Sequence, residues 1–346
     1  MPPVTVAARA RVSLPGPRVA ARTAVDREAP LSHTPRPVIL DCDPGHDDAM
    51  AILLAAGNPT IDLRAITTVA GNQTLAKTTR NAQRVCTVAG IDDVPIAAGC
   101  DRPLRGALLT AGDVHGESGL DGPAFGEPTV AVDDRHAVEV MHEVVQHADR
   151  PVTIVGVGPL TNVATYLDRY PADRGRLERI EIMGGSTGRG NTAPYAEFNV
   201  LVDPEAADVV LRSGVPTTWH GLQVTHQATA TADVLRRIEG LGTPLAAICV
   251  ELLTFFRDTY RALFGLDDPP VHDPVAIAHL IDPVVVGTAR LPMRIELVGE
   301  HTRGATVVDT SGRTGWEPNA EVGLTLAHDR FWDLLIDAID RLGAAG

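Results

Sequence analysis

The sequence predicts an α/β protein in which helices flank both faces of a mostly parallel central sheet. Two observations carry this prediction. From residue 37 onward, short β-branched runs alternate with helical segments of about ten residues, which is the pattern of βαβ units. Polar, glycine-rich segments also follow the predicted strands, where open parallel sheets bind their ligands. No internal repeat or linker divides the region, so a single domain over 37–346 is expected.

Turn residues separate the predicted elements in chain order. A Pro-Gly turn precedes the first helix, and Gly90 ends the second. The segment 99–128 is rich in Gly, Pro and Asp and is predicted to be a loop. Segments 294–297, 305–309 and 321–326 are predicted to form a small antiparallel β-element near the C-terminus. The strands of the sheet are predicted at 38–42, 61–69, 94–97, 152–157, 180–183 and 216–219, and the helices at 47–56, 74–89, 136–147, 160–168, 204–212, 231–239, 244–264, 273–281 and 329–342.

Residues 1–36 differ in kind from the rest of the chain. They combine arginines with Pro, Ala, Ser and Thr and show no periodic apolar face. The Arg-rich composition superficially suits a transit peptide, but the apolar central region of a secretory signal is missing. We expect a disordered N-terminal extension, or a start codon placed too early.

Composition excludes several classes of partner. The formal net charge of −14 would repel phosphate groups, which argues against nucleic acid and against a membrane surface. No apolar run approaches the ~20 residues of a membrane span. The 4 cysteines are scattered without pairing or metal spacing, which indicates reduced thiols and a cytoplasmic protein.

The most acidic stretch of the core, residues 41–48, directly follows the first predicted strand. Asp41 and Asp43 have the alternating spacing of a strand, while Asp47 and Asp48 fall in the first turn of the next helix. Helix capping would explain one or two of these residues but not all of them. Because clustered carboxylates repel one another, the stretch predicts a bound cation. Oxygen-only ligands favour a hard ion, calcium or magnesium.

Several polar segments together resemble one family, the inosine-uridine-type nucleoside hydrolases, which split the N-ribosidic bond of ribonucleosides. The resemblance extends from residue 37 to about residue 343 and implies the nucleoside hydrolase fold. The motif at 41–49 is highly specific for this family. The matching segments are 41–49, 66–74, 95–100, 115–119, 160–162, 183–185, 196–199, 203–206 and 272–274.

The resemblance implies a calcium ion held by Asp43, Asp48, Asp273 and the main-chain carbonyl of Val157. Relatives carry Thr at the last position, but a main-chain ligand tolerates any side chain. A ribonucleoside is the implied small-molecule partner, and relatives suggest a homodimer or homotetramer. The substrate-binding residues implied are Asp47 and Asn199 for the ribose diol, Asn191 and Glu197 for the 5′-hydroxyl, Met183 for the sugar face, and Asn72 in the wall of the site.

The predicted reaction is attack of water on the anomeric carbon through an oxocarbenium-like state. A bound cation would acidify the water, and Asp43 would accept its proton as general base. His272 is the predicted acid for the leaving base, because imidazole titrates near neutral pH. Tyr260 and His115 are candidates for contacts with the base or for sharing the acid role. Other histidines are expected to be structural: His46, His142, His220, His226 and His328.

The base preference is the open part of the prediction. Phe256 stands where the resemblance leads us to expect Tyr, and Gln223 stands where close relatives carry Asp. The presence of both His115 and His272 favours broad or inosine/uridine use over strict purine specificity.

Two other functions compete with hydrolysis. A non-catalytic nucleoside- or ribose-binding protein would keep the metal and the sugar contacts, but the presence of Asp43 and His272 argues against it. A phosphohydrolase would also place Asp-x-Asp after a strand. It would need a lysine to meet the phosphate, and Lys77 lies in a predicted helix.

Overall fold

The computed structural model describes residues 34–345. Residues 1–33, for which we expected a disordered extension, lie outside the described residues. Arg36, which we assigned to the extension, is instead the first residue of strand β1 (Arg36–Cys42). It pairs with Ile61 of the neighbouring strand, and its guanidinium donates a hydrogen bond to the carbonyl of Leu280 at 3.0 Å.

The predicted sheet is confirmed, with nine strands in the order β4-β3-β2-β1-β5-β6-β7-β11-β8. All neighbours pair in parallel except β8, which runs antiparallel to β11 at one edge. Besides β1, its strands are β2 (Ile61–Thr68), β3 (Ile96–Ala98), β4 (Val132–Asp133), β5 (Val152–Gly156), β6 (Leu177–Met183), β7 (Thr217–His220), β8 (Val286–Leu291) and β11 (Ala320–Leu326).

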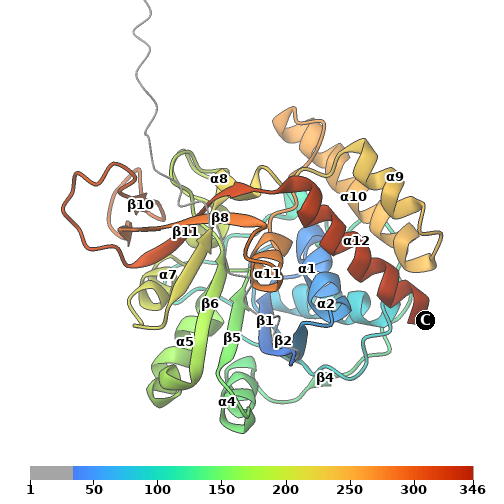
Figure 1. Cartoon of the computed structure of the whole chain (residues 1–346), viewed down its shortest axis with the longest axis horizontal. Helices are drawn as coiled ribbons and strands as arrows, with labels where there is room; N and C mark the ends of the chain where they lie inside the picture. Colours follow the sequence, from blue (N-terminus) through green and yellow to red (C-terminus); the bar gives the residue numbers. More distant parts are fainter. Residues whose placement is uncertain (1–33, 346) are drawn as a thin grey trace, which may run out of the picture.

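Helices cover both faces of the sheet (Figure 1). One apolar core lies between the sheet and α4 (Ala137–His147), α5 (Thr161–Arg169) and α7 (Pro204–Leu211). The other core lies on the opposite face. Its helices are α1 (His46–Gly57), α2 (Leu75–Val88), α9 (Ala232–Glu239), α10 (Pro244–Phe264), α11 (Pro274–Ile281) and α12 (His328–Ala345).

Strand alternation divides side chains between these two cores. In β1, Ile39 belongs to the α4–α5–α7 core, whereas Val38, Leu40 and Cys42 belong to the α1–α11 core. The chain passes from β1 to β2 on one side and later places β5 on the other side of β1. The carboxyl ends of β1 and β5 therefore form a topological switch point, where ligands bind in open α/β sheets.

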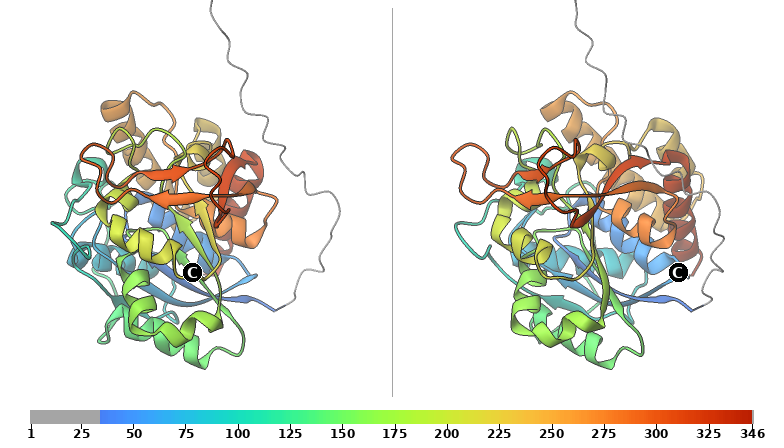
Figure 2. Two further views of the ribbon diagram at one scale, coloured as in Figure 1. Left: turned by 90° about the vertical axis from the view of Figure 1, so that its left-hand side faces the viewer. Right: turned by 60° about the vertical axis from the view of Figure 1, so that its left-hand side comes forward.

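The prediction for the C-terminal β-element is only partly right. Strand β9 (Met293–Ile295) pairs antiparallel with β10 (Thr306–Val308) as a separate two-stranded sheet. The third predicted segment is instead β11, which extends the main sheet between β7 and the unpredicted edge strand β8. The segment 321–326 was expected in a small peripheral element, but its alternating exposed positions lie near the edge of the large sheet. Figure 2 shows these orange and red strands above the yellow-green helix α7.

The shortest elements were not predicted, because they lack a full period of apolar residues. These elements are β4, α3 (Gly112–His115), α6 (Phe198–Val202), α8 (Leu222–Thr225) and the 3-10 helix η1 (Pro171–Arg176).

None of the helices between residues 34 and 345 combines the length and the apolar character of a membrane span.

Candidate active site

A cavity of about 430 Å³ opens at the carboxyl ends of the strands. It collects most of the predicted site residues from widely separated segments of the chain. Asp43 and Asp48 are not part of the lining. Both accept hydrogen bonds from Asn72, and Asn72 does line the cavity. The predicted residues that line the cavity are Asp47, Asn72, His115, Val157, Met183, Asn191, Glu197, Asn199, Tyr260, His272 and Asp273.

The acidic stretch folds into a tight turn at the start of α1. The carboxylate of Asp48 accepts hydrogen bonds from the backbone N–H of Asp43 at 3.0 Å and of Gly45 at 2.9 Å. The carboxylate of Asp43 accepts a bond of 2.6 Å from the backbone N–H of Asn72, which follows β2. Two adjacent strand ends thus fix Asp43.

The backbone at Gly71 and at Gly158 lies so close to the carboxylate of Asp43 that only glycine fits at these two positions. A Cβ atom at Gly71 would lie 2.1 Å from its Oδ2, and one at Gly158 would lie 2.6 Å from its Oδ1. Neither carboxylate oxygen could keep its place beside a larger residue. Gly71 follows β2 and Gly158 follows β5, so the loops on both sides of β1 enclose this carboxylate.

Burial and mutual repulsion disturb the ionisation of the aspartates. Burial, and then the charge of neighbouring carboxylates, raise the pKa of Asp43 and of Asp273 well above the usual range and raise the pKa of Asp47 to about 7. Carboxyl oxygens of Asp47, Asp48 and Asp273 lie within 4.8 Å of one another. Although buried, Oδ1 of Asp43 and Oδ2 of Asp273 have no hydrogen-bond partner.

This donor set fits a hard cation. Its side-chain donors are carboxylate oxygens, and Val157, whose carbonyl accepts a hydrogen bond from Asn199, lines the same cavity. A divalent ion would relieve the repulsion between the aspartates and would give the unpartnered oxygens of Asp43 and Asp273 a ligand. The residues present therefore fit a hard divalent cation.

Asp41 points away from this group, although it belongs to the same sequence motif. Its carboxylate accepts hydrogen bonds from the Thr67 hydroxyl at 2.6 Å and from the Asn162 amide at 2.8 Å. Burial outweighs these two hydrogen bonds and raises its pKa to about 7. Asp41 thus ties β1 to β2 and α5 beneath the site.

A second wall of the cavity carries the residues predicted to bind ribose. The carboxylate of Glu197 caps α6 by accepting bonds from the backbone N–H of Asn199 and Val200, and it also accepts from Gly185. The amide of Asn199 donates to the carbonyl of Val157 at 2.7 Å. Asn191 is exposed at the rim, where its side-chain carbonyl accepts a bond from the backbone of Phe198.

Another wall of the cavity is aromatic. The two ring nitrogens of His272 contact the Thr225 hydroxyl at 2.7 Å and the Tyr260 hydroxyl at 3.2 Å. The ring of His115 stacks on Phe256 and lies with Nδ1 3.1 Å from Nδ1 of His46. Burial lowers the pKa of His272 to about 3 and that of His115 well below its usual value. Neutral rings therefore face the cavity.

The sequence analysis missed part of this wall. Phe256, Tyr260 and Phe264 all line the cavity, and their four-residue spacing on α10 is the signal that would have joined them. His226, which we expected to be structural, also lines the cavity and stands at the C-terminal end of α8. No sequence signal singled out the other lining residues that we missed, which are Ala111, Val114, Arg189, Gly190, Thr192, Phe198 and Leu266.

A second buried polar group lies outside the cavity lining. Glu181, His220 and His279 place potential metal-ligating atoms within 4.8 Å of one another. The sequence analysis predicted a structural role for His220 and did not identify the group. Glu181 and His220 stand on neighbouring strands and His279 on α11, so only the folded structure brings them together.

Comparison with known proteins gives consistent matches. The model of the family described as inosine-uridine preferring nucleoside hydrolase matches residues 38–333. A pyrimidine-specific ribonucleoside hydrolase, RihA of Escherichia coli O1:K1, is 46% identical over 304 residues, covering 88% of this chain and 98% of its own. The purine-preferring ribonucleoside hydrolase of Gardnerella vaginalis superposes with a TM-score of 0.84 at 28% identity, covering 90% of this chain and 100% of its own. A plant nucleoside hydrolase, the PpNRh1 enzyme, gives a TM-score of 0.81 at 31% identity, covering 90% and 99%.

Proposed function

The chain belongs to the inosine-uridine preferring nucleoside hydrolase family, and we propose that it hydrolyses pyrimidine ribonucleosides at a calcium site built by Asp43, Asp48, Asp273 and the Val157 carbonyl. The observation that carries this proposal is the group of buried aspartates with unpartnered oxygens beside the cavity. A bound calcium ion would hold the ribose hydroxyls and lower the pKa of a water molecule.

Asp43 is proposed as the general base. One of its oxygens is occupied by the Asn72 backbone, while Oδ1 is buried and has no hydrogen-bond partner. This free oxygen can accept a proton from the attacking water, and the enclosing glycines hold it in one position. The negative charge of Asp43 and Asp47 also favours the positive charge that develops on the ribose ring.

The ribose would lie between the acidic group and the Glu197–Asn199 wall. Asp47, Met183 and Asn199 line the cavity beside Val157, where hydroxyl groups of the sugar would find both donors and acceptors. The base would then project toward the aromatic wall of His115, Tyr260 and His272.

Protonation of the leaving base is proposed for His272 together with Tyr260. Their side chains are hydrogen-bonded to each other at 3.2 Å, and both line the cavity. The Tyr260 hydroxyl can donate its proton to the departing base, while the Nε2–H group of the neutral His272 ring donates a hydrogen bond to the tyrosine oxygen and stabilises the tyrosinate that is left; Nδ1 of His272 then accepts from the Thr225 hydroxyl.

The pyrimidine preference rests on the relatives. A relative at 46% identity carries a pyrimidine-specific name, whereas the purine-preferring structure is only 28% identical. We therefore expect kcat/KM for uridine and cytidine to exceed that for inosine and adenosine by at least about tenfold. A panel of these nucleosides, assayed for released ribose with and without a chelator, tests the proposal. Tight binding without ribose release would indicate a non-catalytic binding protein instead.

Replacement of His272 separates leaving-group protonation from the other steps. His272→Ala should lower kcat/KM for uridine by about a hundredfold or more, because an unprotonated pyrimidine is a poor leaving group. Nitrophenyl riboside, whose leaving group needs no proton, should lose less than about tenfold. Equal losses on the two substrates, measured side by side, would show that His272 is not part of the acid.

A further inference from the structure

Glu181 is a buried carboxylate in the middle of the sheet. Its strand neighbours Ile180 and Ile182 belong to the core under α5 and α7, so the side chain of Glu181 points to the opposite face, toward α11. Met183, two residues further along β6 on the same face, lines the substrate cavity. Glu181 therefore lies directly behind the site but outside its lining.

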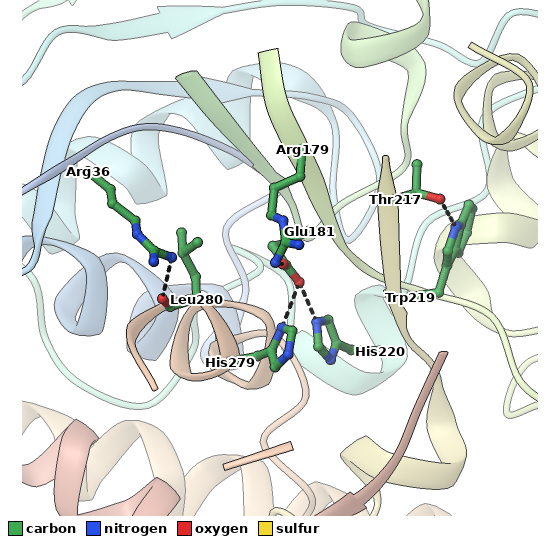
Figure 3. Close-up of polar contacts among 8 residues, drawn as sticks. All are labelled: Arg36, Arg179, Glu181, Thr217, Trp219, His220, His279 and Leu280. Carbon is green, nitrogen blue, oxygen red and sulfur yellow. Dashed lines mark hydrogen bonds and ion pairs between the residues drawn. The ribbon is translucent and has the colours of Figure 1, made fainter. Parts of the chain in front are cut away.

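Three cationic or N–H-bearing side chains converge on this carboxylate (Figure 3). Its Oε2 contacts Nε2 of His220 at 2.8 Å and Nδ1 of His279 at 3.1 Å, while Arg179 lies 3.2 Å from Oε1. Burial alone would raise the pKa of Glu181, but the hydrogen bonds and charges of the two histidines outweigh it and lower the pKa to about 2. An ionised Glu181 thus connects β6, β7 and α11.

These contacts favour a hydrogen-bonded network over a metal site. Both imidazoles direct a nitrogen at the same carboxylate oxygen, at distances normal for N–H···O bonds. The guanidinium of Arg179 stands on the other oxygen and would repel a cation. Glu181 is therefore satisfied by its protein partners, which a buried carboxylate requires.

The network constrains α11, the helix that follows Asp273. The other inward side chains of α11, such as Val275 and Leu280, are buried and apolar, and apolar packing alone does not fix rotation or sliding of a helix. His279 supplies a directional bond near the C-terminal end. Arg36 adds another by donating to the Leu280 carbonyl at 3.0 Å. A short helix moves as a rigid body, so its far end is held in place by these bonds.

Asp273 stands at the near end of this helix, immediately before its first residue. We propose that Glu181 is a positioning residue that, through His279, holds α11 in the place where Asp273 completes the cation site. This inference rests on the calcium site proposed above. Metal affinity is sensitive to such support, because partners outside the ligand shell commonly change it by about 10–100-fold.

The test compares Glu181→Gln with a matched change at Asp173. The side chain of Asp173 is also a buried carboxylate, and it is hydrogen-bonded to Nδ1 of His142 at 2.7 Å. It joins His142 of α4 to Tyr166 of α5 on the other face of the sheet. Both variants should lower the calcium-free melting temperature. Only Glu181→Gln should weaken the calcium Kd, by about tenfold in calorimetric titration. At saturating calcium its kcat on uridine should return to within about threefold of wild type.

Variants of His279 test the hydrogen bond itself. Asparagine can place its amide N–H near the position of Nδ1, so His279→Asn should keep the calcium Kd within about threefold of wild type while His279→Ala weakens it by about tenfold. This pair also decides the matter if Glu181→Gln does not fold.

Three outcomes would overturn the inference. Wild-type calcium affinity in both Glu181→Gln and His279→Ala would show that the network does not position Asp273. Equal weakening in the Asp173 variant would point to a general loss of stability. Zinc bound stoichiometrically by wild type and lost in Glu181→Gln would make the group a metal site. A wild-type protein that binds no calcium would instead contradict the proposed function.

Discussion

Replacing Asp43 with alanine is expected to lower kcat by about three to four orders of magnitude. The change removes Oδ1, a buried carboxylate oxygen without a hydrogen-bond partner that we assign to take the proton from water, and one predicted cation ligand with it. Steady-state assays of ribose release from uridine, at calcium concentrations high enough to saturate the variant, measure the effect. A near-normal kcat would contradict the assignment of Asp43 as base.

Asp41 offers the matched control, because it belongs to the same motif but faces α5. Asp41→Asn keeps an oxygen for the Thr67 hydroxyl and leaves the cavity untouched, so we expect less than about tenfold loss of kcat. Asp43→Asn, which has nearly the same shape as aspartate, should lose about as much as Asp43→Ala. If the Asp41 and Asp43 variants lost equal activity, folding of the motif and not proton transfer would explain the effect.

Removing calcium is expected to abolish more than about 99% of the activity and to lower the melting temperature. Without the ion, the buried carboxyl groups of Asp43, Asp47, Asp48 and Asp273 repel one another or take up protons at a cost. Calcium at about a hundred times its Kd would add about 2.7 kcal/mol to the free energy of unfolding. Thermal scans and ribose assays before and after chelation measure both effects.

Recovery should depend on the ion that is returned. Calcium accepts flexible geometry and many oxygens, whereas magnesium demands a small octahedral site, so calcium should restore activity and magnesium should not. In Asp273→Asn the calcium-induced rise in melting temperature should shrink or disappear. Full activity in the presence of a chelator would rule out the metal-assisted reaction.

Local patterns were enough to predict the centre of this fold and site. Val38–Cys42 and the following aspartates carry strand alternation, a Pro-Gly turn and a helix start within about a dozen residues, so no distant partner was needed. Because parallel strands end at one edge of the sheet, the polar residues after β1, β2, β5 and β6 could also be grouped in advance. The structure brings these segments together.

Features that depend on contacts between distant parts of the chain could not be predicted from the sequence. Nothing in the alternating sequence of β11 reveals that it lies between β7 and β8, since the same pattern suits a small hairpin. The polar group around Glu181 could not be predicted, because its partners His220 and His279 are 39 and 98 residues away in the chain. Phe264 and His226 of the aromatic wall were not predicted, because their place beside Tyr260 and His272 depends on how α10 and the segment after β7 pack in the folded chain.

The proposed aspartate ligands of the cation come from segments far apart in the chain, Asp43 and Asp48 on one side and Asp273 on the other. The backbone N–H of His272, beside Asp273, contacts Asp47 at a sequence separation of 225 residues. Such a site does not exist until the segment carrying α11 has docked onto β1, so nascent chains released before that point cannot use the ion. Once the site has formed, separating the two segments requires the ligand set to be broken first. We therefore expect calcium to act chiefly on the unfolding rate, and to lengthen the lifetime of the folded enzyme against proteases.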